Sequence, residues 1–187
     1  MSPDRLALFC RRMAVVTLWL IIIMLALNAA VWLFPMLASV DGGYGIAFSL
    51  SDRLISSLNQ DLDSFPWWQR LGAMLLSGVP LLALAAGLLN LRSLFANYAS
   101  RDYFSPSSSG HLEKMGRAVV LWVVLNFLCE PLLSFWMTMR EPAGQRLISL
   151  SADSSGVVAL FLAACIIVIA RILRRASEIS AENQQFV

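Results

Sequence analysis

The sequence has little charge for its length. Asp, Glu, Lys and Arg make up 14% of its 187 residues, whereas a soluble domain carries about 25%. Hydrophobic residues make up 58% of the chain, and the mean hydropathy is +0.70. So few polar side chains cannot cover a surface that faces water. The composition therefore argues against a soluble globular domain and favours a protein whose solvent is the lipid bilayer.

The residues that metal, redox and nucleophilic chemistry require are also scarce. The one histidine, His111, belongs to no HExxH pattern and has no cysteine nearby. The three cysteines, Cys10, Cys129 and Cys165, are widely spaced and form no CxxC pair, so we expect free thiols. No GxSxG, Walker A or GxGxxG motif occurs. We therefore predict that the protein is not an enzyme and has no metal site or cofactor. We interpret His111 as an exposed residue near a helix start.

Four apolar segments are long enough, or nearly so, to cross a bilayer as helices, which takes about 20 residues. They cover residues 13–37, 71–91, 118–139 and 156–173. The first is much longer than the apolar part of a cleaved signal peptide, so we expect it to be retained. We predict an all-α membrane protein that forms a single four-helix membrane domain over residues 1–187.

Basic residues are divided unequally between the two sides of these spans. The two terminal segments and the 92–117 loop, together with Arg171 near the end of the fourth span, contain ten Lys and Arg residues, whereas the 38–70 and 140–155 loops contain four. Because basic residues collect on the cytoplasmic side, we predict that both termini and the 92–117 loop are cytoplasmic. The net charge of +2 is too small to indicate direct nucleic-acid binding.

The two outer loops contain short stretches of alternating apolar and polar residues. Residues 45–50 and 146–151 both show this pattern, which predicts two strands that can pair as a small β element. Two strands alone are only marginally stable in water. In the first outer loop, a stretch of helical periodicity follows the first of these strands and predicts a helix lying on the bilayer surface.

The 92–117 loop predicts a surface for a cytoplasmic partner. An apolar stripe at helical spacing continues beyond the second span, and an aromatic residue follows it in the turn. The candidate partner surface comprises Leu94, Phe95, Tyr98 and Phe104. Packing of this stripe against residues 105–117, which begin with the helix-start pair Ser105-Pro106, is the alternative interpretation.

Three polar residues inside the predicted spans are candidates for an intramembrane site. Glu130 lies near the middle of the third span, one turn after Asn126 and directly before Pro131. A carboxylate at that depth costs at least about 2.5–3.5 kcal/mol on insertion scales. Asn28 in the first span lies at a similar depth and is a candidate partner for Glu130. Glu130 is interpreted either as a protonated structural residue or as a binding site for a cation, a proton or a polar ligand.

Three stretches of the chain resemble a family of small bacterial membrane proteins. The first runs from Leu94-Phe95-Ala96-Asn97-Tyr98 to Tyr103-Phe104-Ser105, and the second is His111-Leu112-Glu113-Lys114-Met115-Gly116. The third begins Ala170-Arg171-Ile172-Leu173-Arg174-Arg175-Ala176 and continues to Glu182-Asn183. These stretches resemble the domain of unknown function 2975 family, whose members span the membrane four times. The chain departs from the family in Ser100-Arg101-Asp102, where a glycine is expected.

The resemblance implies a location in the bacterial inner membrane and no established reaction. It also implies a possible small helix-turn-helix regulator as partner. Together with the 92–117 loop, it leads to the hypothesis of a non-enzymatic regulator or sensor that binds a small cytoplasmic protein. The alternative is a small transporter or channel that uses Glu130 with Asn28. The partners expected are therefore the lipid bilayer and a soluble protein, and the sequence leaves a homo-oligomer open.

Overall fold

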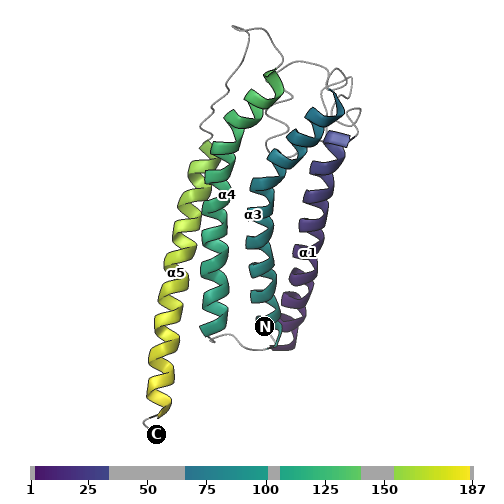
Figure 1. The fold of residues 1–187 in the computed structure, drawn as a ribbon. Coiled ribbons are helices and arrows are strands. Elements are labelled where there is room, and N and C mark those ends of the chain that lie inside the picture. Colours follow the sequence, from purple (N-terminus) through teal and green to yellow (C-terminus); the bar gives the residue numbers. More distant parts are fainter. Residues whose placement is uncertain (1–2, 34–65, 101–105, 140–153, 186–187) are drawn as a thin grey trace. The chain divides into compact units, whose positions relative to one another are not determined.

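The described part of the chain is entirely helical. A computed structural model describes residues 3–33, 66–100, 106–139 and 154–185. They form four helices, α1 (Pro3–Leu33), α3 (Trp67–Ala99), α4 (Pro106–Thr138) and α5 (Ser154–Gln185) (Figure 1). The strand pair predicted at 45–50 and 146–151, together with the surface helix between them, lies outside the described residues.

Each of the four helices is long and apolar enough to cross a membrane. The candidate spans are Arg5–Leu33, Trp67–Ala99, Ser107–Thr138 and Ser154–Ile179. Only 11% to 33% of the most apolar part of each helix is buried within the chain. The remaining apolar surface needs a lipid covering, because water would not solvate it favourably. The protein is therefore a multi-pass membrane protein, as its composition predicts.

The helices extend further than the apolar spans that the sequence predicts. α3 continues to Ala99, eight residues beyond the predicted end at 91, as the apolar stripe of the following loop indicates. α4 begins at Pro106, where the fixed φ of proline suits the first helical position. α5 continues to Gln185 through the charged C-terminal segment. The observed α1 ends at Leu33, and residues 34–37 of the first predicted span lie outside the described residues.

The chain divides into two compact units, which are described separately. Unit 1 comprises Met1–Ile21, Ala83–Val123 and Ser154–Val187. Unit 2 comprises Ile22–Leu82 and Val124–Asp153. Unit 1 therefore contains all of α5 together with the N-terminal parts of α1 and α4 and the C-terminal part of α3. Unit 2 contains the complementary parts of α1, α3 and α4.

A compact apolar core joins the three helices of unit 2. Five buried residues form this core: Trp32 of α1, Ala73 of α3, and Cys129, Leu133 and Met137 of α4. The indole of Trp136 packs directly over Gly72, where an added Cβ would lie 2.5 Å from a ring atom. Because Gly72 has no side chain, the Trp136 ring can lie directly against the backbone of α3. Small residues allow close helix packing in membranes in the same way.

Small residues also bring helices together within unit 1. A Cβ at Gly87 of α3 would lie 2.9 Å from the Cβ of Ala118 of α4. A Cβ at Gly116 of α4 would lie 2.6 Å from the Ile167 side chain and 3.2 Å from the carbonyl oxygen of Ala163, both on α5. α4 therefore contacts α3 and α5 through glycine positions that leave no room for a larger side chain.

Candidate functional site

Polar side chains are concentrated in the interior of unit 2. Six polar residues there are buried even though most of the surrounding helix surface is apolar: Asn28, Gln69, Ser77, Glu130, Ser134 and Thr138. Burying a polar group without a hydrogen bond is costly, and in hydrocarbon no water compensates for it. Their position inside the bundle rather than toward lipid makes this cluster the first candidate site.

A hydrogen-bonded chain of three side chains connects α1 to α3. The indole Nε1 of Trp32 donates to the hydroxyl oxygen of Ser77 over 3.0 Å. The Ser77 hydroxyl in turn lies 3.0 Å from Oδ1 of Asn28 and 3.2 Å from the carbonyl oxygen of Met74. Its single proton can be donated to either of these acceptors. Ser77 thus receives one hydrogen bond from α1 and can return another to it.

Glu130 is buried on α4, as the intramembrane-site prediction requires. Its side chain and that of Asn28 are 3% and 5% exposed, so both point into the protein and not toward lipid. The hydrogen-bond partner described for the Asn28 amide oxygen is Ser77, and the direct contact between Asn28 and Glu130 stays a prediction. Asn126 is half-buried, and its Oδ1 is enclosed with no hydrogen-bond donor among the described residues.

The sequence interpretation missed the role of α3 in this cluster. Ser77 is the link between Trp32 and Asn28, yet a lone serine in an apolar span gives little sign of function. The available signal is periodicity, because the buried residues of α3 recur every four positions: Gln69, Ala73, Ser77, Leu81 and Ala85. A four-residue repeat containing small and polar residues is typical of a helix face that packs against other helices in a membrane.

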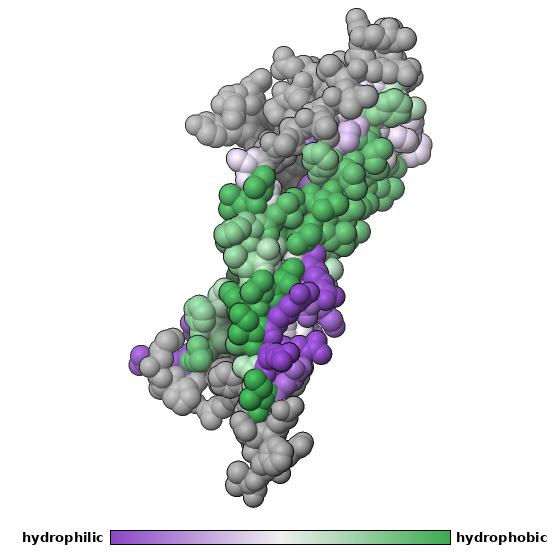
Figure 2. Space-filling view, turned by 90° about the vertical axis from the view of Figure 1, so that its left-hand side faces the viewer, coloured by the Kyte–Doolittle hydropathy of each residue, from purple (hydrophilic) through white to green (hydrophobic). Residues whose placement is uncertain are grey.

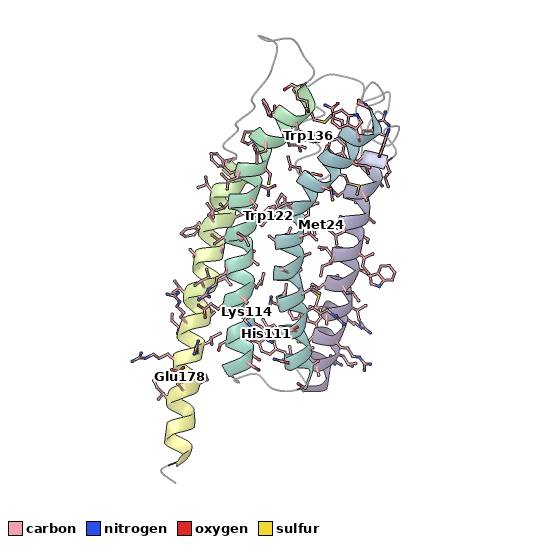
Figure 3. All side chains as sticks on the ribbon, viewed as in Figure 1. Met24, His111, Lys114, Trp122, Trp136 and Glu178 are labelled. Carbon is pink, nitrogen blue, oxygen red and sulfur yellow. The ribbon has the colours of Figure 1, made fainter. Side chains whose placement is uncertain are left out.

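In unit 1, hydrogen bonds also join the C-terminal end of α3 to the N-terminal end of α4. We call this end of unit 1, which includes the N-terminal end of α1 and the C-terminal end of α5, the basic end. The amide of Asn97 on α3 donates to the hydroxyls of Ser107 and Ser108 on α4, over 3.3 and 3.5 Å. His111 Nδ1 lies 3.2 Å from Oδ1 of Asn90, and Figure 3 shows His111 on the side of α4 next to α3. These contacts hold the end of α3 to the beginning of α4.

The prediction that His111 is solvent-exposed is wrong, since the residue is half-buried. The amide nitrogen of Asn90 donates to the Ala86 carbonyl over 2.8 Å, which turns Oδ1 toward the imidazole. An amide oxygen only accepts, so Nδ1 of His111 carries the proton. No group of three or more potential metal ligands occurs among the described residues.

A carboxylate at the basic end connects α4 to α5. Oε1 of Glu113 lies 2.6 Å from Nη2 of Arg117, one turn further along α4, and 3.6 Å from Nε of Arg171 on α5. The Glu113 side chain is only 14% exposed, whereas the two arginine side chains are 65% and 66% exposed. One largely enclosed carboxylate oxygen thus holds two guanidinium groups that face outward.

The candidate partner surface is only partly available. Leu94 is buried in unit 1, so its side chain does not lie on the surface of the described residues. Phe95 and Tyr98 are half-buried, and Phe104 lies outside the described residues. The C-terminal part of α5 also presents exposed side chains at the basic end, with residues 171–176 all exposed.

All three cysteines are free thiols, as their spacing predicts. Cys10 and Cys129 are buried, and Cys165 is half-buried. Because two of the three are enclosed in the protein, they act as small apolar residues in its packing.

Comparison with known proteins identifies a family and no closer relative. Residues 54–187 match the family described as "Protein of unknown function (DUF2975)". No curated protein and no solved structure matches the chain. The match includes all three stretches on which the resemblance rests, and Glu113 of the second contacts Arg171 of the third. Since the match extends over more than half of the chain, the protein belongs to the DUF2975 family.

Proposed function

We propose that the protein is a non-enzymatic regulator or sensor of the bacterial inner membrane that binds a small cytoplasmic protein. The excess of arginine and lysine at the basic end supports a cytoplasmic location for both termini. The observation that carries the proposal is an exposed helical extension at this end. A helix that continues into water beyond its neighbours presents its side chains to soluble proteins.

The length of this extension follows from the contact between Glu113 and Arg171, which lie at the same level. From Glu113, α4 continues only to Pro106, which is seven residues or about 10 Å away. From Arg171, α5 continues to Gln185, which is 14 residues or about 21 Å away. α5 therefore extends about 10 Å further than the start of α4.

The exposed part of α5 that leads from Arg171 into this extension combines apolar side chains with charges. Ile172 and Ile179 are 62% and 53% exposed, and their spacing of seven places them on one face of the helix. Arg174 and Glu178 form an ion pair over 3.2 Å, with both side chains more than half exposed. An apolar line beside charges is the pattern by which a helix binds in a groove of another protein. A small helix-turn-helix regulator, as the family analogy suggests, is one partner of this kind.

The test is copurification of the full chain in mild detergent with quantification of the bound cytoplasmic protein. We expect one soluble protein to be enriched with the wild type and lost from the Ile172→Ser/Ile179→Ser variant. Leu8→Ser is the matched control, because Leu8 is equally exposed in unit 1 but belongs to α1. Recovery of no soluble protein, or an equal loss from the control, would contradict the proposal.

A transporter or channel is the second candidate, and the burial of Glu130 in a polar interior favours it. It is tested with the wild type and Glu130→Gln in proteoliposomes that contain a pH-sensitive dye, under an imposed membrane potential. Transport requires a proton flux in the wild type that Glu130→Gln abolishes at unchanged melting temperature. A structural role is indicated if Glu130→Gln lowers the melting temperature and neither protein conducts.

A further inference from the structure

The cationic site around Glu113 stands where the long uncharged stretches of α4 and α5 end. We propose that Arg117 and Arg171 bind the phosphate of an anionic phospholipid headgroup. The site differs from the proposed protein-binding extension, which lies beyond it on α5. It also differs from the polar cluster of unit 2, which lies in the other unit.

Glu113 brings the two guanidinium groups together from different helices. Nη2 of Arg117 and Nε of Arg171 contact the same oxygen of its carboxylate. Two positive charges therefore share one negative charge, which leaves an excess of one positive charge. A guanidinium has five N–H donors, so each arginine retains donors for a second anion. Arginine binds phosphate through two parallel hydrogen bonds, which a lysine cannot provide.

Both arginines lie at the boundary that a lipid phosphate occupies. α5 has no charged residue from Ser154 to Ala170, which is 17 residues or about 25 Å. This is shorter than the hydrocarbon thickness of about 30 Å, so the charge of Arg171 is drawn to the headgroup layer. Arg117 is the last charged residue before the apolar stretch of α4 begins at Ala118. The shared carboxylate shows that the two arginines occupy one level.

The surroundings of the site suit a phospholipid on both sides. Two further basic residues stand beside it on the two helices, namely Lys114 and Arg175, and both are exposed. On the membrane side, Leu121 lies one turn after Arg117 and Val168 nearly one turn before Arg171, and both are more than half exposed. Figure 2 shows a hydrophobic area giving way to a hydrophilic one on the face that includes α5. A phospholipid fits these surroundings, because its phosphate can lie against the basic residues while its acyl chains lie against the neighbouring apolar surface.

The experiment measures phosphatidylglycerol binding to the full chain in neutral detergent by native mass spectrometry, with phosphatidylcholine as the reference lipid. We expect the wild type to prefer phosphatidylglycerol. Because each basic residue near an anionic lipid contributes about a fivefold gain in affinity, Arg117→Gln/Arg171→Gln should weaken binding about 25-fold. The control Arg11→Gln/Arg12→Gln removes the same charge from exposed positions on α1 and should weaken binding clearly less, because no carboxylate shared between helices is described for these two arginines.

A second variant separates the geometry of the site from its charge and folding. Arg117→Lys/Arg171→Lys keeps both charges. It should still lose part of the preference for phosphatidylglycerol, since lysine lacks the planar guanidinium that binds phosphate through two hydrogen bonds. Thermal unfolding of each variant shows that it is folded. An equal loss in the α1 control, or equal binding of both lipids to the wild type, would overturn the proposal. Displacement of phosphatidylglycerol by an equal concentration of inorganic phosphate would overturn it as well, because the acyl chains would then contribute nothing.

Discussion

Gln69 and Trp136 bind each other's backbone in both directions. The side-chain amide of Gln69 donates to the carbonyl oxygens of Trp136 and Met137, over 2.9 and 2.8 Å. The indole Nε1 of Trp136 donates to the carbonyl oxygen of Gln69 over 3.1 Å. These carbonyls belong to the last turn of α4, where no later N–H group of the helix is available to donate a hydrogen bond to them. The pair therefore closes the C-terminal end of α4 onto the first turn of α3.

Removal of one of these hydrogen bonds gives the first testable expectation. Trp136→Phe deletes the indole N–H but keeps an aromatic ring over Gly72 and next to Trp68, whose ring centroid is 6.0 Å away. We expect a loss of about 0.5–1.5 kcal/mol in the free energy of unfolding. Chemical denaturation in detergent measures it.

Trp122 provides the matched control for this change. Its indole nitrogen is buried and has no hydrogen-bond partner among the described residues. Trp122→Phe therefore removes no hydrogen bond and should cost clearly less than Trp136→Phe. An equal or larger loss for Trp122→Phe would show that the indole hydrogen bond of Trp136 contributes nothing to stability.

Glycine substitutions in α3 and α4 should act in opposite directions. A Cβ at Gly72 would overlap the Trp136 ring, so we expect Gly72→Ala to destabilise the protein by about 1–3 kcal/mol. A Cβ at Gly110 of α4 would meet nothing within 4 Å, and Gly110→Ala should stabilise the helix by about 0.5–1 kcal/mol. Melting temperatures in detergent test both. A fall with Gly110→Ala, or none with Gly72→Ala, would contradict the described packing.

Ser77→Ala tests the hydrogen-bonded chain of unit 2. The change deprives Trp32 of an acceptor and Asn28 of a donor, both in a buried setting. Side-chain hydrogen bonds in membrane proteins average about 0.6 kcal/mol and reach about 1.7, so we expect a loss of about 1–2 kcal/mol. Ser93→Ala is the control, because among the described residues the Ser93 hydroxyl bonds to the Leu89 carbonyl of its own helix, at an exposed position. Equal losses for the two variants would refute a special role for Ser77.

The existence of the helices could be predicted because it depends on composition alone. A segment of about 20 apolar residues needs lipid, and in lipid its backbone must form a helix. The continuation of α3 to Ala99 and the start of α4 at Pro106 also follow from local signals, namely an apolar stripe and a helix-start proline. Hydropathy gives the boundaries poorly, since these helices continue past the apolar stretches into charged segments.

The contacts between helices could not be predicted in the same way. A helix in lipid is apolar on its inner and outer faces, so hydropathy does not show which face meets a neighbour. The burial of Glu130 could be expected, because charge avoids lipid, whereas the pairing of Asn28 with Ser77 depends on how α1 and α3 are rotated. The pairing of Glu113 with Arg171 brings together residues 58 positions apart in the sequence, and neither residue alone indicates the other.

The direction of the helices is the claim on which the proposed function rests, and cysteine labelling in intact cells tests it most directly. With the three native cysteines replaced by alanine, Glu178→Cys carries a thiol on the exposed extension of α5, and Ser57→Cys carries one in the 38–70 loop. A membrane-impermeant maleimide is expected to label Ser57→Cys in intact cells and Glu178→Cys only after permeabilisation. Labelling of Glu178→Cys in intact cells would place the basic end outside and contradict a cytoplasmic partner.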